Sequence, residues 1–373
     1  MHIYDYIIIG SGTTGLTIAR QIFQETQNIL VLEAQDEVGG NNRPVKLNDH
    51  VLNNGLRYFP HTDASMKALG FLQQLLPQPV LKSTEPVENG VQTYESTGFK
   101  KFLGFGEHSP EFYDQLSYYL SNNEAGLQMQ PYEWIQQFAQ DLAPVIQNKS
   151  IVTRFGFEGL DTEKPKLTHV IVNGSKTLYA QNFIFAGEVK DLALLVPDDV
   201  LNARNKAKLK KSTAWQSVNL DLYHEAKVEK RNLFLLNGTT DDDIGPCIGR
   251  FVSDHYSQWT SFVESEIAED TENIGHVLKK MKRQIKRAFP ELADSIKKER
   301  ISVSTALSGS DLKLSANGTL PKVDNLWIAS AQMSPYQNLL GSLMQARLIL
   351  SSLGFVSNAD IEPQIENETT IEA

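Results

Sequence analysis

Near its start the chain reads Tyr4-Asp5-Tyr6-Ile7-Ile8-Ile9-Gly10-Ser11-Gly12-Thr13-Thr14-Gly15. A run of apolar residues leads into glycines with the spacing Gly-x-Gly-x-x-Gly, and a helix-compatible run follows from Thr14. In such a turn Gly10 allows the sharp change from strand to helix, Gly12 lets the backbone approach a pyrophosphate, and Gly15 lets helix and strand pack closely. The helix N-terminus then faces the pyrophosphate charge. The stretch predicts a dinucleotide-binding βαβ unit.

The second strand of this unit supports the prediction. Ile29-Leu30-Val31-Leu32 is apolar and ends at Glu33-Ala34, about 20 residues after the glycines, where ribose hydroxyls are bound in such units. A chance glycine turn would not have this context. Because Glu33 would repel the 2′-phosphate of NADP, the adenosine half should belong to FAD or NAD.

A second glycine pair favours FAD. Gly39-Gly40-Asn41 follows soon after Glu33, and Asn54-Gly55-Leu56-Arg57 comes a little later. This pattern resembles the flavoprotein superfamily of amine oxidases, protoporphyrinogen and phytoene oxidoreductases and UDP-galactopyranose mutase. The resemblance implies that the backbone of Gly39, Gly40 and Asn41 lies along the pyrophosphate and ribityl chain of FAD. It also implies that Gly55, Leu56 and Arg57 pass beside the isoalloxazine ring.

The same resemblance extends to the rest of the chain. It implies that a strand around Phe155 contacts adenine, and that a C-terminal strand, turn and helix close the cofactor site. The helix start at Asn338-Leu339 would then offer backbone N–H groups to the flavin. One departure stands out: the family usually has Gly-Asp, or Gly-Arg in the mutases, where this chain has Ser330-Ala331. We still expect Ser330 to contact the cofactor, and we expect FAD to bind more weakly without the usual carboxylate.

The expected fold class is α/β. A Rossmann-type FAD-binding domain, discontinuous in sequence, should be joined to an α+β substrate domain with an antiparallel sheet plus helices. The FAD-binding domain takes residues 1–76, 149–204 and 301–356; the substrate domain takes 77–148 and 205–300; residues 357–373 should form a disordered tail. Aromatic residues of predicted helices at 110–120 and 131–142, Tyr118 and Tyr119 among them, could line a pocket, but ordinary packing is favoured.

Composition excludes several function classes. The chain has 35 basic and 45 acidic residues and a net charge of −10, without a basic stripe, so we expect no nucleic-acid partner. No apolar run reaches the roughly 18 residues of a membrane span. Cys247 is the single cysteine, and the N-terminus leads straight into a strand without room for a signal peptide, which indicates the cytoplasm. The acidic run 241–243 hints at a calcium loop, but Gly245 occupies a ligand position, so a plain turn and no metal are expected.

Three residues are the candidates for the catalytic face. Arg57 and His61 follow the flavin-facing glycine, and Tyr336 lies on the closing segment, so they could converge on one side of the ring. A cation there would stabilise the reduced flavin anion, and His61 could exchange a proton near neutral pH. The alternative is that Arg57 pairs with a carboxylate and that His61 caps the turn at Thr62-Asp63.

The leading functional hypothesis is an FAD-dependent, amine-oxidase-like oxidoreductase that takes a hydride from a substrate carbon next to nitrogen or oxygen. The lysine that amine oxidases commonly carry near the flavin is missing from the matching segment, Trp215 to Leu220. Two alternatives stay open. One is a flavin monooxygenase or oxidase acting on a large or protein substrate during maturation of another enzyme. The other is a non-catalytic, flavoprotein-derived binding subunit.

Overall fold

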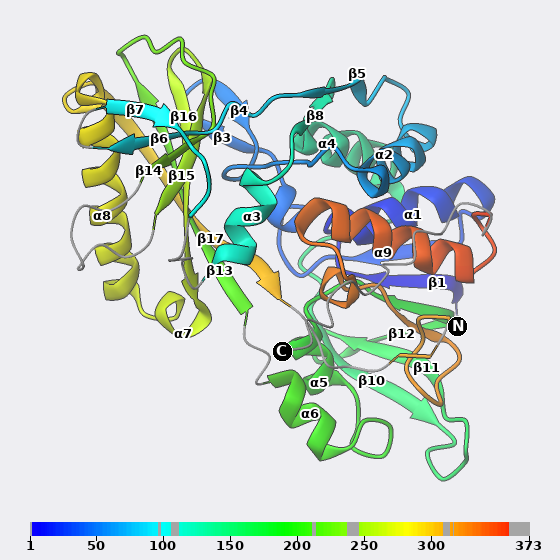
Figure 1. Cartoon of the computed structure of the whole chain (residues 1–373). Helices are drawn as coiled ribbons and strands as arrows, with labels where there is room; N and C mark the ends of the chain where they lie inside the picture. The colour runs from blue at the N-terminus through cyan, green and yellow to red at the C-terminus, as the bar shows by residue number, and fades with distance from the viewer. Residues whose placement is uncertain are drawn as a thin grey trace, which may run out of the picture.

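The computed structural model describes residues 2–95, 98–105, 112–210, 214–236, 246–308, 314–315 and 317–357. Two units lie side by side, each built on one large β-sheet (Figure 1). The expected tail from residue 358 onward, the acidic run 241–243 with Gly245, and the first two residues of the predicted helix 110–120 lie outside the described residues.

The first unit contains the predicted βαβ element. Its sheet has the strand order β10-β11-β12-β1-β2-β9, with β18 paired to β12. β1 lies between two parallel neighbours, and Ile7 is in register with both Leu30 and Phe183. Such a central parallel strand is covered on both faces, which explains its unbroken apolar run. The strands are β1 (Ile3–Ile9), β2 (Ile29–Leu32), β9 (Ile146–Gln147), β10 (Val152–Glu158), β11 (Lys166–Val172), β12 (Lys176–Phe185) and β18 (Leu326–Ile328).

Helices cover both faces of this sheet (Figure 1). One face carries α1 (Thr13–Glu25), α2 (Asp63–Leu75), α4 (Pro131–Asp141) and α9 (Asn338–Ser352). The other carries α5 (Val189–Leu195) and α6 (Ala203–Lys210). Helix α4 falls in the range 77–148, where the sequence predicts the substrate domain, yet its Trp134 and Phe138 are fully buried in the same core as α1 and α9. Residues 131–147 therefore pack with the first unit.

The second unit contains the expected antiparallel sheet. Its order is β17-β13-β16-β15-β14-β6-β7, and every pairing is antiparallel except that of β14 with β6. β17 runs across the 300/301 boundary, so the whole strand belongs to this unit. The strands are β6 (Gln92–Glu95), β7 (Gly98–Lys101), β13 (Ala214–His224), β14 (Phe234–Leu236), β15 (Cys247–Ser253), β16 (Tyr256–Glu264) and β17 (Ile296–Ser308).

The two faces of β13 differ in character, which follows from the two-residue period of a strand. Val218 and Leu220 face the outer helix α8 (Thr271–Ala288), whose Met281 and Ile285 are buried against the sheet. The alternate residues Ser217, Asn219 and Asp221 are polar and also buried. This polar face is turned toward the first unit, because an added Cβ on Gly55 would lie 2.5 Å from the Asn219 side chain.

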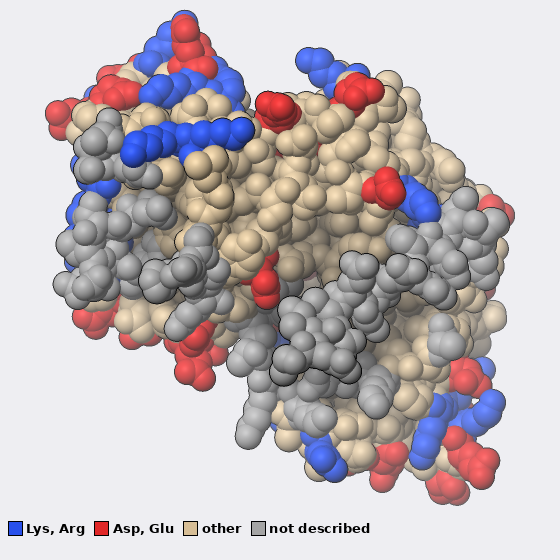
Figure 2. Space-filling view, in the orientation of Figure 1, with Lys and Arg blue, Asp and Glu red and all other residues tan. Residues whose placement is uncertain are grey.

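Smaller elements connect the two sheets. Helix α3 lies between them in Figure 1. The remaining elements are β3 (Val45–Leu47), β4 (His50–Leu52), β5 (Leu81–Val87), β8 (Glu124–Leu127), α3 (Tyr113–Leu120), α7 (Ser265–Ala268) and the short 3-10 turns at Gly40–Asn42, Ala143–Val145, Pro290–Leu292 and Ala331–Met333. None of the described helices is both long and apolar enough to cross a membrane. On the face shown in Figure 2, charged side chains gather at the two outer ends, and the visible surface between them is mostly uncharged.

Candidate cofactor and substrate site

A cavity of about 750 Å³ lies where the two units meet. Its lining comes from both sheets and from the loops between them. The predicted site residues that line it are Gly10, Gly12, Thr14, Glu33, Ala34, Gly40, Asn41, Arg57, Ser330, Tyr336, Asn338 and Leu339. Most of the residues singled out from the sequence are therefore brought to one continuous space.

The glycine turn has the geometry that its sequence predicts. A Cβ on Gly15 would lie 2.0 Å from the carbonyl oxygen of Gly10, so only glycine lets α1 pack this close to β1. A Cβ on Gly12 would meet nothing within 4 Å, and Gly12 lines the cavity. The backbone at Gly12 therefore stays open to a ligand, whereas Gly15 serves packing and does not line the cavity.

Two helix N-termini open into the same cavity. α1 begins after Gly12 and α9 begins after Gln337, and neither has a side chain that caps it. Their first N–H groups are thus available to an anion or a carbonyl oxygen. Asn338 at the start of α9 has φ +52°, a conformation that favours glycine, and such strain clusters at functional sites. Within the described residues, the buried Oε1 of Gln337 has no hydrogen-bond partner.

Glu33 lies at one end of the cavity, and its carboxylate is held in place. Oε2 accepts hydrogen bonds from the Ser11 N–H (3.0 Å) and the Ser11 hydroxyl, and Oε1 accepts one from the Gln35 N–H (2.8 Å). A carboxylate has about four lone-pair positions, so about one remains for a ligand hydroxyl. The glycine turn and the acid that follows β2 are thus joined directly by Ser11.

Arg57 lines another part of the cavity and is fixed by three acceptors. Its Nε donates to Asn42 Oδ1 (2.8 Å), Nη1 donates to the Leu56 carbonyl oxygen (3.1 Å), and Nη2 donates to the Asn41 carbonyl oxygen. Among the described residues Arg57 forms no ion pair, and it is the sole lysine or arginine that lines the cavity. Burial lowers the pKa of Arg57, and the tyrosines Tyr118 and Tyr119 are close enough to influence it.

Tyr118 and Tyr119 of α3 both line the cavity. The Tyr118 hydroxyl donates to the carbonyl oxygen of Tyr58 (2.6 Å). The Tyr119 hydroxyl makes no hydrogen bond to any other described residue, although the residue is 4% exposed. Burial raises the pKa of both phenols, so both stay protonated over the physiological range. The two rings therefore do more than pack: they form part of the cavity wall.

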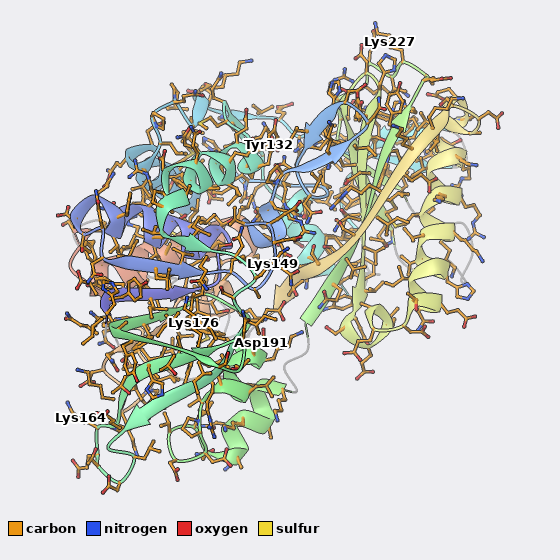
Figure 3. The ribbon with its side chains drawn as sticks, turned by 180° about the vertical axis from the view of Figure 1, so that it is seen from behind. Tyr132, Lys149, Lys164, Lys176, Asp191 and Lys227 are labelled. Atoms are coloured by element: carbon orange, nitrogen blue, oxygen red, sulfur yellow. The ribbon has the colours of Figure 1, made fainter. Side chains whose placement is uncertain are left out.

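The substrate-domain sheet and α5 complete the lining. Ser217 on β13 and Thr305 on β17 face the cavity, and the Thr305 hydroxyl donates to Glu188 Oε1 (3.2 Å). Asp191 lies nearby at the junction of the two units (Figure 3). Burial and the neighbouring Glu188 raise the pKa of Asp191. In the described part of the chain, no group of three His, Cys, Asp or Glu is placed to hold a metal ion.

Comparison with known proteins shows which of them share this fold. The model of the NAD(P)-binding Rossmann-like domain matches residues 8–75. The flavin-containing amine oxidase A of Equus caballus is 44% identical over 50 residues, which are 13% of this chain and 9% of that protein. Cyclohexylamine oxidase from Brevibacterium oxydans IH-35A superposes over 95% of this chain and 98% of its own, with a TM-score of 0.65 and 12% identity. The chain has the same fold as this amine oxidase.

A second solved structure shows the same fold. A candidate protoporphyrinogen oxidase from Exiguobacterium sp. 255-15 has a TM-score of 0.65 and 12% identity, and the match covers 95% of this chain and 99% of the other. The resemblance noted at Gly39-Gly40-Asn41 is therefore confirmed for the fold. The sequence match to the horse amine oxidase spans 9% of that protein's length.

Six predicted site residues do not line the cavity of this amine-oxidase-like fold. His61 is turned elsewhere: its Nε2 lies 2.8 Å from the Thr84 carbonyl oxygen. The structure thus brings Arg57 and Tyr336 to the cavity but leaves His61 outside it. Thr62, and not His61, caps the N-terminus of α2, because the Thr62 hydroxyl accepts a hydrogen bond from the Ser65 N–H (3.2 Å). The other five are Gly15, Gly39, Gly55, Leu56 and Phe155.

Phe155 differs from its expectation for a clear reason. Its side chain is buried in the core on the α5 side of the sheet, near Phe185. Residues 150–153, just before and at the start of β10, line the cavity in its place. The strand was identified correctly, but the approach to the cavity occurs a few residues earlier. Gly39, Gly55 and Leu56 lie in segments whose neighbours Gly40 and Arg57 line the cavity.

Other lining residues carried no signal in the sequence. Ser217 and Thr305 come from strands that are far apart in sequence, and Asn42 and Ser11 act through side-chain contacts. Gln332 also lines the cavity and accepts a hydrogen bond from the Val189 N–H (2.7 Å). It follows Ser330-Ala331, where the family usually has Gly-Asp. The only signal in the sequence for Gln332 is that a polar residue follows the position where the Gly-Asp motif is missing.

Proposed function

We propose that the chain binds FAD in this cavity and is an FAD-dependent oxidoreductase that moves a hydride from its substrate to the flavin. One observation carries the proposal: a single cavity joins a dinucleotide-type end at Gly12 and Glu33 to a wall made by Arg57, Tyr119 and Ser217. The cavity thus has a place for the adenosine half of a cofactor and a second place, between the units, for its reactive half and a substrate.

The residues present fit FAD. Gly12 leaves its backbone open, the first N–H groups of α1 suit a pyrophosphate, and Glu33 has an acceptor position left for a ribose hydroxyl. At the other end, the uncapped start of α9 and the unpartnered Gln337 Oε1 suit a group that both accepts and donates hydrogen bonds. Ser330 and Gln332 would supply neutral contacts where the family has a carboxylate.

When bound, the flavin supplies the hydride acceptor. The chain's part is to position, to exclude water and to balance charge. Arg57 offers a fixed positive charge, which stabilises negative charge that develops nearby. Tyr118, Tyr119 and Ser217 close the space and orient the substrate. The names of the matched proteins, flavin-containing amine oxidase and cyclohexylamine oxidase, favour an amine as substrate. A neutral amine needs no strong base, which agrees with a lining that holds no lysine among the described residues.

The first experiment asks whether the purified protein carries FAD. We expect flavin absorbance from the wild type and a colourless, folded Gly12→Val variant. The second adds a panel of primary and secondary amines under anaerobic conditions and follows bleaching of the flavin. Arg57→Met should keep FAD but slow this reduction at least about tenfold, as for a lost charged interaction of roughly 1.4 kcal/mol.

Two results would redirect the proposal. A wild-type protein that neither carries nor takes up FAD would favour the non-catalytic binding subunit. A yellow protein that no amine reduces, but that is reduced by or oxidises another protein, would favour the alternative of a large substrate.

A further inference from the structure

An ion pair between a buried aspartate and a partly exposed arginine lies on the polar face of the substrate-domain sheet, outside the cavity lining. The Asp221 side chain on β13 is fully buried, and its Oδ2 accepts from Arg300 Nη1 on β17 (3.1 Å). The other oxygen, Oδ1, accepts from Gln258 Nε2 (2.9 Å) on β16. Three neighbouring strands thus meet at one carboxylate.

The pair reaches into the first unit through two further hydrogen bonds. Arg300 Nη2 donates to Asn54 Oδ1 (2.7 Å), and Gln258 Nε2 donates to the Asn53 carbonyl oxygen (2.8 Å). Asn54 Nδ2 in turn donates to the Asn41 carbonyl oxygen (3.3 Å). That same oxygen accepts from Arg57 Nη2. A chain of contacts therefore runs from Asp221 to the guanidinium that lines the cavity.

The charges along this chain also act on one another. Asp221 is close enough to oppose the lowering of the Arg57 pKa by burial, and Arg300 adds to that lowering. Two guanidiniums and one carboxylate leave one net positive charge, which lies on the side of the cavity where Arg57 is. Without Asp221 the net charge would be one unit higher, and without Arg300 one unit lower.

A buried pair of this kind is a poor way to gain stability. Desolvation offsets much of its attraction, and apolar residues of similar size often do as well. What the apolar alternative lacks is the fork of Arg300, which bonds Asp221 and Asn54 at the same time. A lysine has one ammonium group and cannot reproduce that geometry. Placement of the segment 53–57 explains the arrangement better than stability does.

We infer that Asp221 and Arg300 are a positioning pair, which holds segment 53–57 against the substrate-domain sheet and sets the net charge beside Arg57. The inference rests on the proposed function for its consequence: with FAD bound, the pair tunes the reduction potential of the flavin. Neither residue touches the cavity. Their influence passes through Asn54, Asn41 and Arg57.

The test uses the full chain and five variants. Asp221→Asn removes a negative charge and should raise the flavin potential; Arg300→Gln removes a positive charge and should lower it. The expected size is a tenfold change in the ratio of affinities for reduced and oxidised FAD, about 30 mV for a two-electron couple. The double variant Asp221→Asn/Arg300→Gln restores the net charge and should return near the wild-type potential. Glu299→Gln is the matched control, because Glu299 neighbours Arg300 on β17 but pairs with Lys282 of α8.

A second readout does not need the cofactor. Hydrogen exchange of the amides at 53–57 should quicken in Arg300→Gln and in Arg300→Lys, which keeps the charge but loses the fork, and stay unchanged in Glu299→Gln. The inference is overturned if Asp221→Asn and Arg300→Gln shift the potential in the same direction, or if exchange at 53–57 matches wild type in Arg300→Gln. If the wild type binds no FAD, the proposed function fails, while the exchange measurement still decides whether the pair positions the segment.

Discussion

Arg250 and Glu124 form a two-point ion pair that also holds the backbone of Arg57. Arg250 Nη1 donates to Glu124 Oε2 (2.6 Å), and Nη2 donates both to Oε1 (2.9 Å) and to the Arg57 carbonyl oxygen (2.8 Å). The pair joins β15 of the second unit to β8, which follows α3. Arg57 is thus held through its backbone from one side and through its guanidinium from the other.

Arg250→Met should destabilise the protein, because it leaves the Glu124 charge without its partner. Removing one member of a buried pair costs about 3–5 kcal/mol. Since the two side chains keep 23% and 15% exposure, we expect the lower end, about 3 kcal/mol. Urea unfolding measures this. Lys282→Met, which breaks a pair with 32% and 33% exposure, should cost at most about 1 kcal/mol. Equal losses in the two variants would show that Arg250 has no special role.

Gly12→Val should lose FAD binding, whereas Gly15→Ala should lose stability. A Cβ at position 12 would meet no atom within 4 Å, and Gly12 lines the cavity, so the variant should stay within about 1 kcal/mol of wild type and lose FAD. The new Cβ at position 15 would lie 2.0 Å from the Gly10 oxygen and must displace α1. We expect a loss of at least about 1–3 kcal/mol. Thermal unfolding and flavin content, measured together, separate the two effects. A stable Gly12→Val protein with full flavin content would place the pyrophosphate elsewhere.

Glu33→Gln should weaken FAD binding while keeping the shape of the side chain. A hydrogen bond to a charged acceptor contributes about 1.5–3 kcal/mol, so affinity should fall by about one to two decades. Titration of FAD into apoprotein measures the change. Ser11→Ala is the control, because it removes the hydroxyl bond to Oε2 but leaves the carboxylate free to bind a ribose. If Ser11→Ala weakens binding as much as Glu33→Gln, the carboxylate acts by holding the turn.

The features that could be predicted are those set by neighbours in sequence. Gly12, Gly15 and Glu33 lie within one βαβ unit, and the geometry of that unit depends on local steric rules. The antiparallel sheet of the second unit could be predicted for the same reason. Helix α4 shows the limit, because its apolar stripe predicts a helix but does not say which sheet it will cover.

The cavity wall on the substrate side could not be predicted in the same way. Ser217, Thr305 and Tyr119 come together through packing between units, and no local pattern sets that packing. His61 illustrates the opposite error. Its place in a motif suggested the cavity, but a hydrogen-bonding distance to the Thr84 carbonyl oxygen turns the ring toward β5.

The ionised carboxylate of Asp191 should lower the stability of the folded protein as the pH rises from acid to neutral. Burial and Glu188 raise the folded-state pKa of Asp191 above the unfolded value of about 3.9. Between those two values the folded state binds more protons, so this group's contribution falls as the pH rises. Asp191→Asn should therefore be more stable than wild type at pH 7, and the difference should vanish below about pH 3.9. Urea unfolding at several pH values tests the sign. In a Glu188→Gln background the difference should shrink, and a difference that grows toward acid would refute the assignment.

Tyr118 and Tyr119 provide the last and most direct test of the substrate wall. Tyr118→Phe loses the hydrogen bond to the Tyr58 carbonyl oxygen and should cost about 1 kcal/mol of stability. Tyr119→Phe removes a hydroxyl that bonds no described residue, so stability should change by less than about 0.5 kcal/mol. If that hydroxyl donates to the substrate, amine-driven flavin reduction should slow by about three- to tenfold, the value of a lost neutral hydrogen bond of ~0.5–1.5 kcal/mol. Unfolding curves should then show the larger loss of stability in Tyr118→Phe, and anaerobic reduction should show the larger loss of rate in Tyr119→Phe. Wild-type reduction by Tyr119→Phe over the whole amine panel would remove Tyr119 from the substrate site.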